Sequence, residues 1–152
     1  MRNGKYIMIL CVCAGCFFMA NQIAADPGKN DTSPPIAEKA SMEWIAFYFH
    51  GNFRCDSCRN IEQYSRESIE LYFSEQLKAG ELTFKVINTD QPEHKHFVED
   101  YQLYTKSLVI AEFKDGKQVK WKNLAKVWDY LKDQDKFYQY VKSEVQKFLE
   151  GM

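Results

Sequence analysis

The pattern of apolar and polar positions along the chain predicts strands that alternate with helices. Residues 43–49 are apolar on both alternations, which is typical of a strand covered on both faces. Residues 82–88 and 107–113 predict two further strands. Asp115-Gly116 is the signal of a tight hairpin, which would return residues 118–121 as an antiparallel edge strand.

Helical spacing follows the first and second predicted strands. The small and apolar face of the first helix consists of Cys58, Ile61, Ser65, Ser68 and Tyr72. We expect Thr89 or Asp90 to cap a second helix, with Pro92 in its first turn. This helix would run to about Tyr101.

Two more helical patterns follow the hairpin, a short one over 124–131 and a longer one over 137–149. The early strand, helix, strand order predicts a parallel pair joined by a right-handed crossover, and the hairpin adds antiparallel strands. The predicted fold class is therefore α/β, a three-layer α/β/α sandwich with a mixed central sheet.

Residues 1–25 have the order of a secretory signal peptide. Two basic residues precede an apolar run over 6–20, which is short for a transmembrane helix, and small residues follow at 24–25. A second interpretation is a lipoprotein signal, because Cys13-Ala14-Gly15-Cys16 resembles a lipoprotein box with Cys16 as the lipidated residue. An uncleaved anchor is the third. All three predict export to the periplasm or cell envelope, with membrane contact only through this segment.

The remaining chain divides into a linker and one domain. Residues 26–41 place Pro and Gly among polar side chains and predict a flexible linker, and residues 42–152 form the predicted domain. Because 45% of the residues are apolar, with 11 Phe and 9 Tyr, the composition excludes a disordered chain. The formal net charge of −1, without a basic stripe, argues against nucleic acid as a partner.

The chemistry of the predicted domain centres on Cys55 and Cys58, its two cysteines. Cys55 would lie just ahead of a helix, where unpaired backbone N–H groups and the helix dipole favour a thiolate. Cys58 would lie one turn further on. An exposed attacking thiol and a nearby resolving thiol are what thiol–disulfide exchange requires. We therefore predict a thiol–disulfide oxidoreductase that uses this redox-active disulfide and no other cofactor.

Residues flanking the pair would tune it. Arg54 should lower the pKa of Cys55, whereas the negative charge of Asp56 acts in the opposite direction. His50 closes the strand expected under the helix, and it is a candidate for relaying protons to Cys58.

Two other interpretations of the pair stay open. Cys55 and Cys58 could be half of a zinc site, with His94 and His96 as the other ligands, although the i, i+2 spacing of the histidines directs them to different faces. The pair could also form a purely structural disulfide.

The strand, Cys-x-x-Cys and helix unit resembles thioredoxin, as do residues 88–93, 97–103 and the hairpin 113–117. The resemblance covers roughly residues 42–150. It implies a thioredoxin-like fold and disulfide exchange with a protein thiol or disulfide partner.

Departures from the thioredoxin pattern qualify this resemblance, among them Asp56-Ser57 in place of Gly-Pro between the cysteines. Arg54 replaces the tryptophan that usually precedes the first cysteine, and Phe49 takes the place of the buried acid. The cis-proline that faces the cysteines, and in the family keeps metals off the thiols, is missing near Ser107 and Leu108. The backbone of these two residues is nevertheless expected to pair with a substrate chain, and Arg54 to contact the substrate.

The string from Phe47 to Cys55, with Cys58 and Ile61-Glu62, is similar to the ArsF-type family, described as nitrophenyl compound nitroreductase subunits. This resemblance implies an alternative function, in which the protein is an accessory subunit of a reductase or of an aromatic arsenical resistance system. In that role the two thiolates would hold a metalloid or a soft metal ion, with little activity of their own.

Overall fold

The structure, a computed structural model, describes residues 42–151. The predicted signal peptide, the lipidation at Cys16 and the predicted linker over 26–41 lie outside the described residues. The described strands are β1 (Met42–His50), β2 (Leu82–Asn88), β3 (Ser107–Lys114) and β4 (Lys117–Asn123). They form one sheet in the order β2-β1-β3-β4. β1 is parallel to β2 and antiparallel to β3, and β3 and β4 form the hairpin, so the mixed sheet is confirmed.

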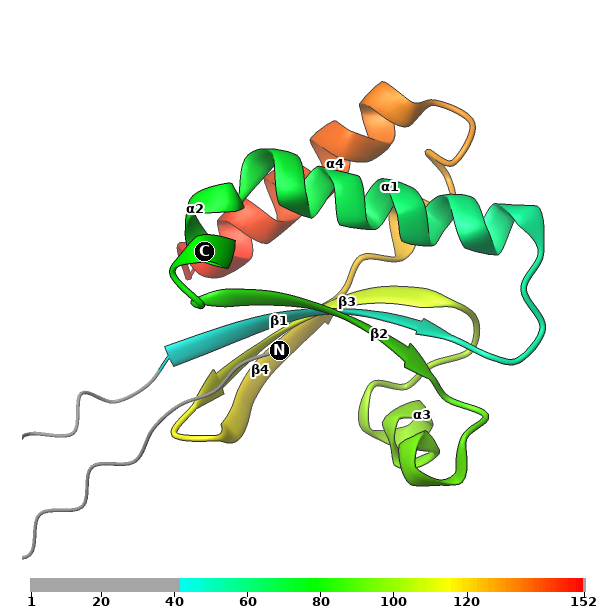
Figure 1. The fold of residues 1–152 in the computed structure, drawn as a ribbon, viewed down its shortest axis with the longest axis horizontal. Coiled ribbons are helices and arrows are strands. Elements are labelled where there is room, and N and C mark those ends of the chain that lie inside the picture. The colour runs from blue at the N-terminus through cyan, green and yellow to red at the C-terminus, as the bar shows by residue number, and fades with distance from the viewer. Residues whose placement is uncertain (1–41, 152) are drawn as a thin grey trace, which may run out of the picture. The chain divides into compact units, whose positions relative to one another are not determined.

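The helices form a layer on each side of the sheet. They are α1 (Asp56–Tyr72), α2 (Ser74–Lys78), α3 (His96–Asp100) and α4 (Gln134–Leu149), with 3-10 turns at Pro92–His94 and Ala125–Val127. Figure 1 shows α1 and α4 side by side over one face and α3 against the other. The three-layer arrangement and the strand order make the fold thioredoxin-like, as predicted.

Both faces of β1 are buried, which explains its continuous apolar run. Ala46 and Tyr48 point into the core shared with α1 and α4. Phe47 and Phe49 point to the other side, where they pack with Tyr101 beside α3. The central strand therefore fixes the helix layers on both sides.

The predicted capping of the second helix by Thr89 or Asp90 is wrong. The segment begins with the 3-10 turn at Pro92, and its N-cap Gln91 makes no side-chain capping bond. The reason is that both polar side chains are used elsewhere: the Thr89 hydroxyl donates to the carbonyl of His50, and Asp90 accepts from the backbone of Asn52. They hold the loop after β1 instead of a helix.

The predicted helix over 124–131 is also wrong, because only the 3-10 turn Ala125–Val127 forms there. Leu124 and Val127 are fully buried, so their apolar pattern reflects tertiary packing. The five-residue helix α2 escaped prediction because it buries no side chain and therefore leaves no apolar pattern.

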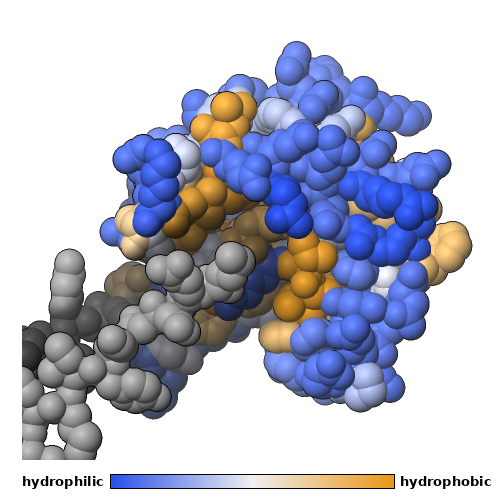
Figure 2. Space-filling view, in the orientation of Figure 1, coloured by the Kyte–Doolittle hydropathy of each residue, from blue (hydrophilic) through white to orange (hydrophobic). Residues whose placement is uncertain are grey.

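The edge strand β2 has half-buried apolar side chains on both faces: Phe84 and Val86 pack against the core shared with α1 and α4, and Ile87 packs against the cluster beside α3. Figure 2 shows hydrophobic residues exposed among hydrophilic ones across the middle of one face of the molecule. Within residues 42–151, no helix combines the length and the apolar content needed to cross a bilayer.

Two neighbouring positions on α1 test the assignment of its buried face. Ile69 is fully buried, whereas Leu71 is 61% exposed. We expect Ile69→Ala to lower the free energy of unfolding by about 2–5 kcal/mol, because it leaves a cavity in the core. Leu71→Ala, the matched control, should change it by less than about 0.5 kcal/mol. Urea denaturation followed by circular dichroism measures both, and equal effects would contradict the assignment.

Candidate functional site

Cys55 is the N-cap of α1, and its sulfur does the capping. Its backbone is extended (φ −80°, ψ 170°), and the Cys58 N–H donates to Cys55 Sγ at 3.4 Å. Cys55 is partly exposed, while Cys58 is 1% exposed, and both are free thiols. The site thus combines one accessible sulfur with one buried sulfur a turn later.

The environment lowers the pKa of the Cys55 thiol. The largest cause is a hydrogen bond with the Cys58 side chain, followed by the bond from the Cys58 backbone N–H. The positive charge of Lys106 lowers the pKa further, while desolvation opposes these effects. A thiolate at Cys55 is therefore favoured, in accord with its place at a helix start.

Arg54, expected to supply this positive charge, is engaged elsewhere. Its guanidinium forms an ion pair with Glu62 of α1, and Glu62 also accepts from Arg66. The cation that lowers the pKa of Cys55 is Lys106. Contact between Arg54 and a substrate stays a prediction.

Tyr48 is the side chain of β1 that reaches the second cysteine. Its hydroxyl donates to the Cys58 carbonyl at 2.6 Å, and burial raises the pKa of the phenol. Phe49, which takes the place of the buried acid in the sequence, faces the α3 layer. Because side chains alternate along a strand, Tyr48 could have been predicted to face the cysteines if the face of β1 that α1 covers had been known.

His50 is the last residue of β1 and contacts Tyr48. Its ring stacks on that of Tyr48 with 6.1 Å between centroids, and its Nδ1 lies 2.8 Å from the Gly51 carbonyl. Since a carbonyl only accepts, Nδ1 carries the proton, and in the neutral ring Nε2 is the basic nitrogen. Proton transfer by His50 stays a prediction.

The loop from His50 to Cys55 is held against the end of β2. Asp90 Oδ2 accepts from the Asn52 N–H at 2.6 Å, and the Asn88 amide donates to Asn52 Oδ1 at 2.8 Å. A Cβ on Gly51 would lie 2.8 Å from Asp90 Oδ2, so only glycine fits without displacing the carboxylate. These contacts fix the path by which the chain enters α1.

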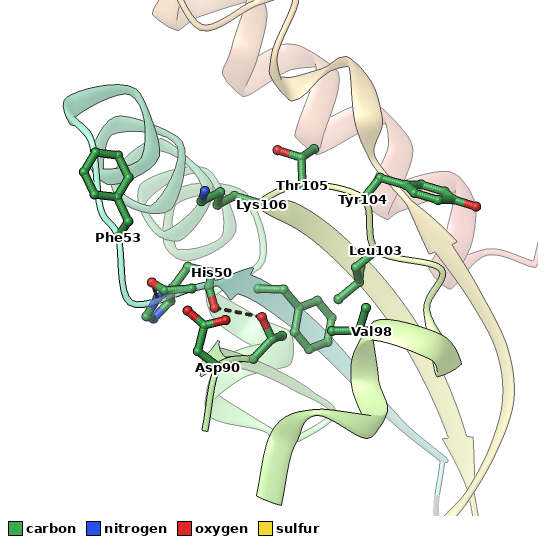
Figure 3. Close-up of a pocket in the computed structure, with 11 residues that line it drawn as sticks. His50, Phe53, Asp90, Val98, Leu103, Tyr104, Thr105 and Lys106 are labelled. Atoms are coloured by element: carbon green, nitrogen blue, oxygen red, sulfur yellow. Dashed lines mark hydrogen bonds between the residues drawn. The ribbon is translucent and has the colours of Figure 1, made fainter. Parts of the chain in front are cut away.

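A pocket of about 220 Å³ opens beside the loop that leads to Cys55. Figure 3 shows Tyr104, Thr105 and Lys106 along one side of it, opposite His50 and Asp90. Its lining consists of Phe49, His50, Gly51, Phe53, Thr89, Asp90, Val98, Leu103, Tyr104, Thr105 and Lys106.

Ser107 and Leu108, expected to pair with a substrate chain, are themselves buried. The Leu108 carbonyl already accepts from the Leu124 N–H at 2.8 Å, so it is occupied. Lys106, directly before them, lines the pocket together with Leu103, Tyr104 and Thr105, and its carbonyl accepts from Trp128 Nε1 at 2.9 Å. Lys106 was not among the site residues predicted from the sequence, although it directly precedes Ser107, which was predicted to bind substrate.

The two histidines considered as zinc ligands have other partners. His94 Nδ1 lies 3.1 Å from the Asn88 carbonyl, and His96 Nδ1 lies 2.7 Å from Asp100 Oδ2. Within residues 42–151, no cluster of three or more His, Cys, Asp or Glu side chains has a metal-binding arrangement.

Solved structures of two thioredoxins are similar to this chain. Fasciola hepatica thioredoxin is 22% identical with a TM-score of 0.35, and the match covers 60% of this chain and 81% of that one. Reduced Schistosoma mansoni thioredoxin pre-protein is 22% identical with a TM-score of 0.34, and the match covers 59% and 77%. No family model and no curated protein matches the chain. The fold assignment above rests on strand order and pairing.

A pH titration of the thiolate absorbance at 240 nm tests which contacts lower the pKa of Cys55 most. In the reduced protein we expect the first thiolate to form below the ordinary cysteine pKa of about 8.5. Cys58→Ala removes the largest cause and should raise the pKa most, whereas Cys58→Ser keeps a hydrogen-bond donor and should raise it less. An unchanged midpoint in Cys58→Ala would contradict this account.

Proposed function

We propose that the protein is an exported thiol–disulfide oxidoreductase in which Cys55 attacks and Cys58 resolves. The observation that carries the proposal is the capping geometry: an accessible sulfur accepts the Cys58 N–H at the start of α1, and the partner sulfur is buried one turn later. This arrangement supports a stable thiolate at Cys55 and a protected resolving thiol.

In the reducing direction, the Cys55 thiolate attacks one sulfur of a partner disulfide. The partner S–S bond breaks, and the released partner thiolate takes up a proton. Cys58 then loses its proton and attacks Cys55 Sγ, which forms the Cys55–Cys58 bond and releases the second partner thiolate. Two electrons pass from the protein dithiol to the partner, and the oxidising direction is the reverse.

We assign the movement of the Cys58 proton to His50. It ends the strand that carries Tyr48, whose hydroxyl reaches the Cys58 backbone. No described residue bonds its Nε2, which therefore stays available to a proton. Tyr48 is unsuited to this role, because its own proton is bonded to a carbonyl and burial raises its pKa.

Single cysteine substitutions test the proposal. Cys55→Ser should abolish exchange with a disulfide substrate, because the attacking sulfur is gone. Cys58→Ser should still attack but fail to resolve, so a mixed disulfide with the partner should accumulate and release on reduction. Non-reducing electrophoresis and mass spectrometry detect this adduct, and full activity of Cys55→Ser would contradict the proposal.

The second candidate function is an accessory subunit that holds a soft ion, as the ArsF-type resemblance implies. The observation in its favour is the pair of free thiols one turn apart, which suits an ion such as copper(I) or trivalent arsenic that prefers sulfur.

Titration of the reduced protein with copper(I) or trivalent arsenite tests this candidate. We expect one ion for each Cys55–Cys58 pair, detected by sulfur-to-metal charge-transfer absorbance, and no binding by Cys55→Ser. A reduced protein that binds neither ion would contradict the accessory function and leave disulfide exchange in place.

A further inference from the structure

The pocket beside the loop that leads to Cys55 is lined by one lysine, Lys106. Among the described residues its ammonium group forms no salt bridge, in contrast to Lys120 and Lys122, which pair with glutamates. In Figure 3 its side chain extends from the loop before β3 toward the side of Phe53, which leads into α1. The charge of Lys106 also lowers the pKa of Cys55, so it acts on the attacking cysteine as well as on the pocket.

The backbone that carries Lys106 is fixed, although its side chain is not paired. The Lys106 carbonyl accepts from Trp128 Nε1 at 2.9 Å, and the Ser107 hydroxyl donates to the Thr105 carbonyl at 3.0 Å. A fixed backbone lowers the entropy lost when a ligand binds the ammonium group.

Among the described residues, none of the other ionisable groups that line the pocket forms an ion pair with Lys106. Asp90, on the opposite side, already accepts the Asn52 N–H and lies against Gly51. His50 donates to the Gly51 carbonyl, and Tyr104 is a phenol. A negatively charged group that enters the pocket would thus find Lys106 as its partner.

Two of the side chains that line the pocket are aromatic and exposed to solvent. Phe53 is 76% exposed and Tyr104 is 96% exposed, and both line the pocket. Exposed aromatic side chains near a polar centre are typical of a surface that binds another polypeptide. An extended segment that delivers its disulfide to Cys55 could cover both rings.

We propose that Lys106 is a specificity-determining residue that selects partner polypeptides with an acidic side chain beside the reactive disulfide. An apolar side chain of the same segment packs on Phe53 or Tyr104. This inference rests on the proposed exchange function and names its substrate class.

The expected size of the preference follows from the exposure of the charge. A solvent-exposed ion pair changes a rate or binding constant by about twofold to fivefold. The preference for an acidic peptide should decrease at 1 M salt, because the Debye length is about 3 Å there and about 8 Å at physiological ionic strength.

The experiment uses the full-length reduced protein and three disulfide peptides. The peptides share one aromatic residue and differ only in Asp, Asn or Lys beside the cysteine, and hydroxyethyl disulfide is the uncharged reference. We expect kcat/KM for the Asp peptide to exceed that for the Asn peptide by about twofold to fivefold. The Lys peptide should be disfavoured by a similar factor.

Substitution of Lys106 identifies the source of the preference. Lys106→Gln should abolish it and Lys106→Glu should invert it. The ratio of two peptides is the readout, since any change in the pKa of Cys55 affects both peptides alike. Lys117→Glu is the matched control: it makes the same charge change at the hairpin, at the other end of β3, and should keep the wild-type ratio.

Equal rates for the three peptides, or a preference that persists in Lys106→Gln, would overturn the inference. Failure to reduce even hydroxyethyl disulfide would instead contradict the proposed function. In that case the inference is tested by measuring how tightly the protein binds the same peptides with serine in place of cysteine. A preference for Asp that Lys106→Glu reverses supports it, and equal binding overturns it.

Discussion

One hydrogen bond, from the Cys58 N–H to the Cys55 sulfur, links the fold to its chemistry. Helices usually begin with an oxygen acceptor from Ser, Thr, Asp or Asn, and here a sulfur takes that place. A thiolate is a stronger acceptor than a thiol, so the N–H that is bonded at the start of α1 also favours the charged form of Cys55. In the disulfide that we propose, this acceptor would weaken, and the first turn of α1 would be coupled to the redox state of the pair.

The second constraint is the burial of β1 on both faces. Because neighbouring residues of a strand point to opposite sides, Tyr48 and Phe49 serve different layers. Tyr48 supports the backbone of Cys58, and Phe49 packs beside α3. The strand therefore positions the cysteines from below, while the clamp of Asp90 on Asn52 positions them from the side.

The sheet could be predicted from the sequence because its signals are local. The bounds of β2 are those of the apolar run 82–88, and the hairpin follows from Asp115-Gly116, where both residues have positive φ. The contact of Asp90 with Asn52, 38 residues away, and that of Lys106 with Trp128, 22 residues away, could not be predicted, since each joins segments far apart in the sequence. The same cause explains the failed caps, because the side chains of Thr89 and Asp90 stabilise a loop 38 or 39 residues away.

The close approach of Gly51 to Asp90 means that two distant positions share one small volume. A side chain at residue 51 would occupy space that the carboxylate fills, 2.8 Å from where its first carbon would lie. Among homologues that keep this backbone, residue 51 can grow only where residue 90 shrinks or turns away, and the Asn52 N–H then loses its acceptor. We therefore expect substitutions at the two positions to be correlated. The small size of residue 51, four positions before Cys55, is thus required by the carboxylate that follows the end of β2.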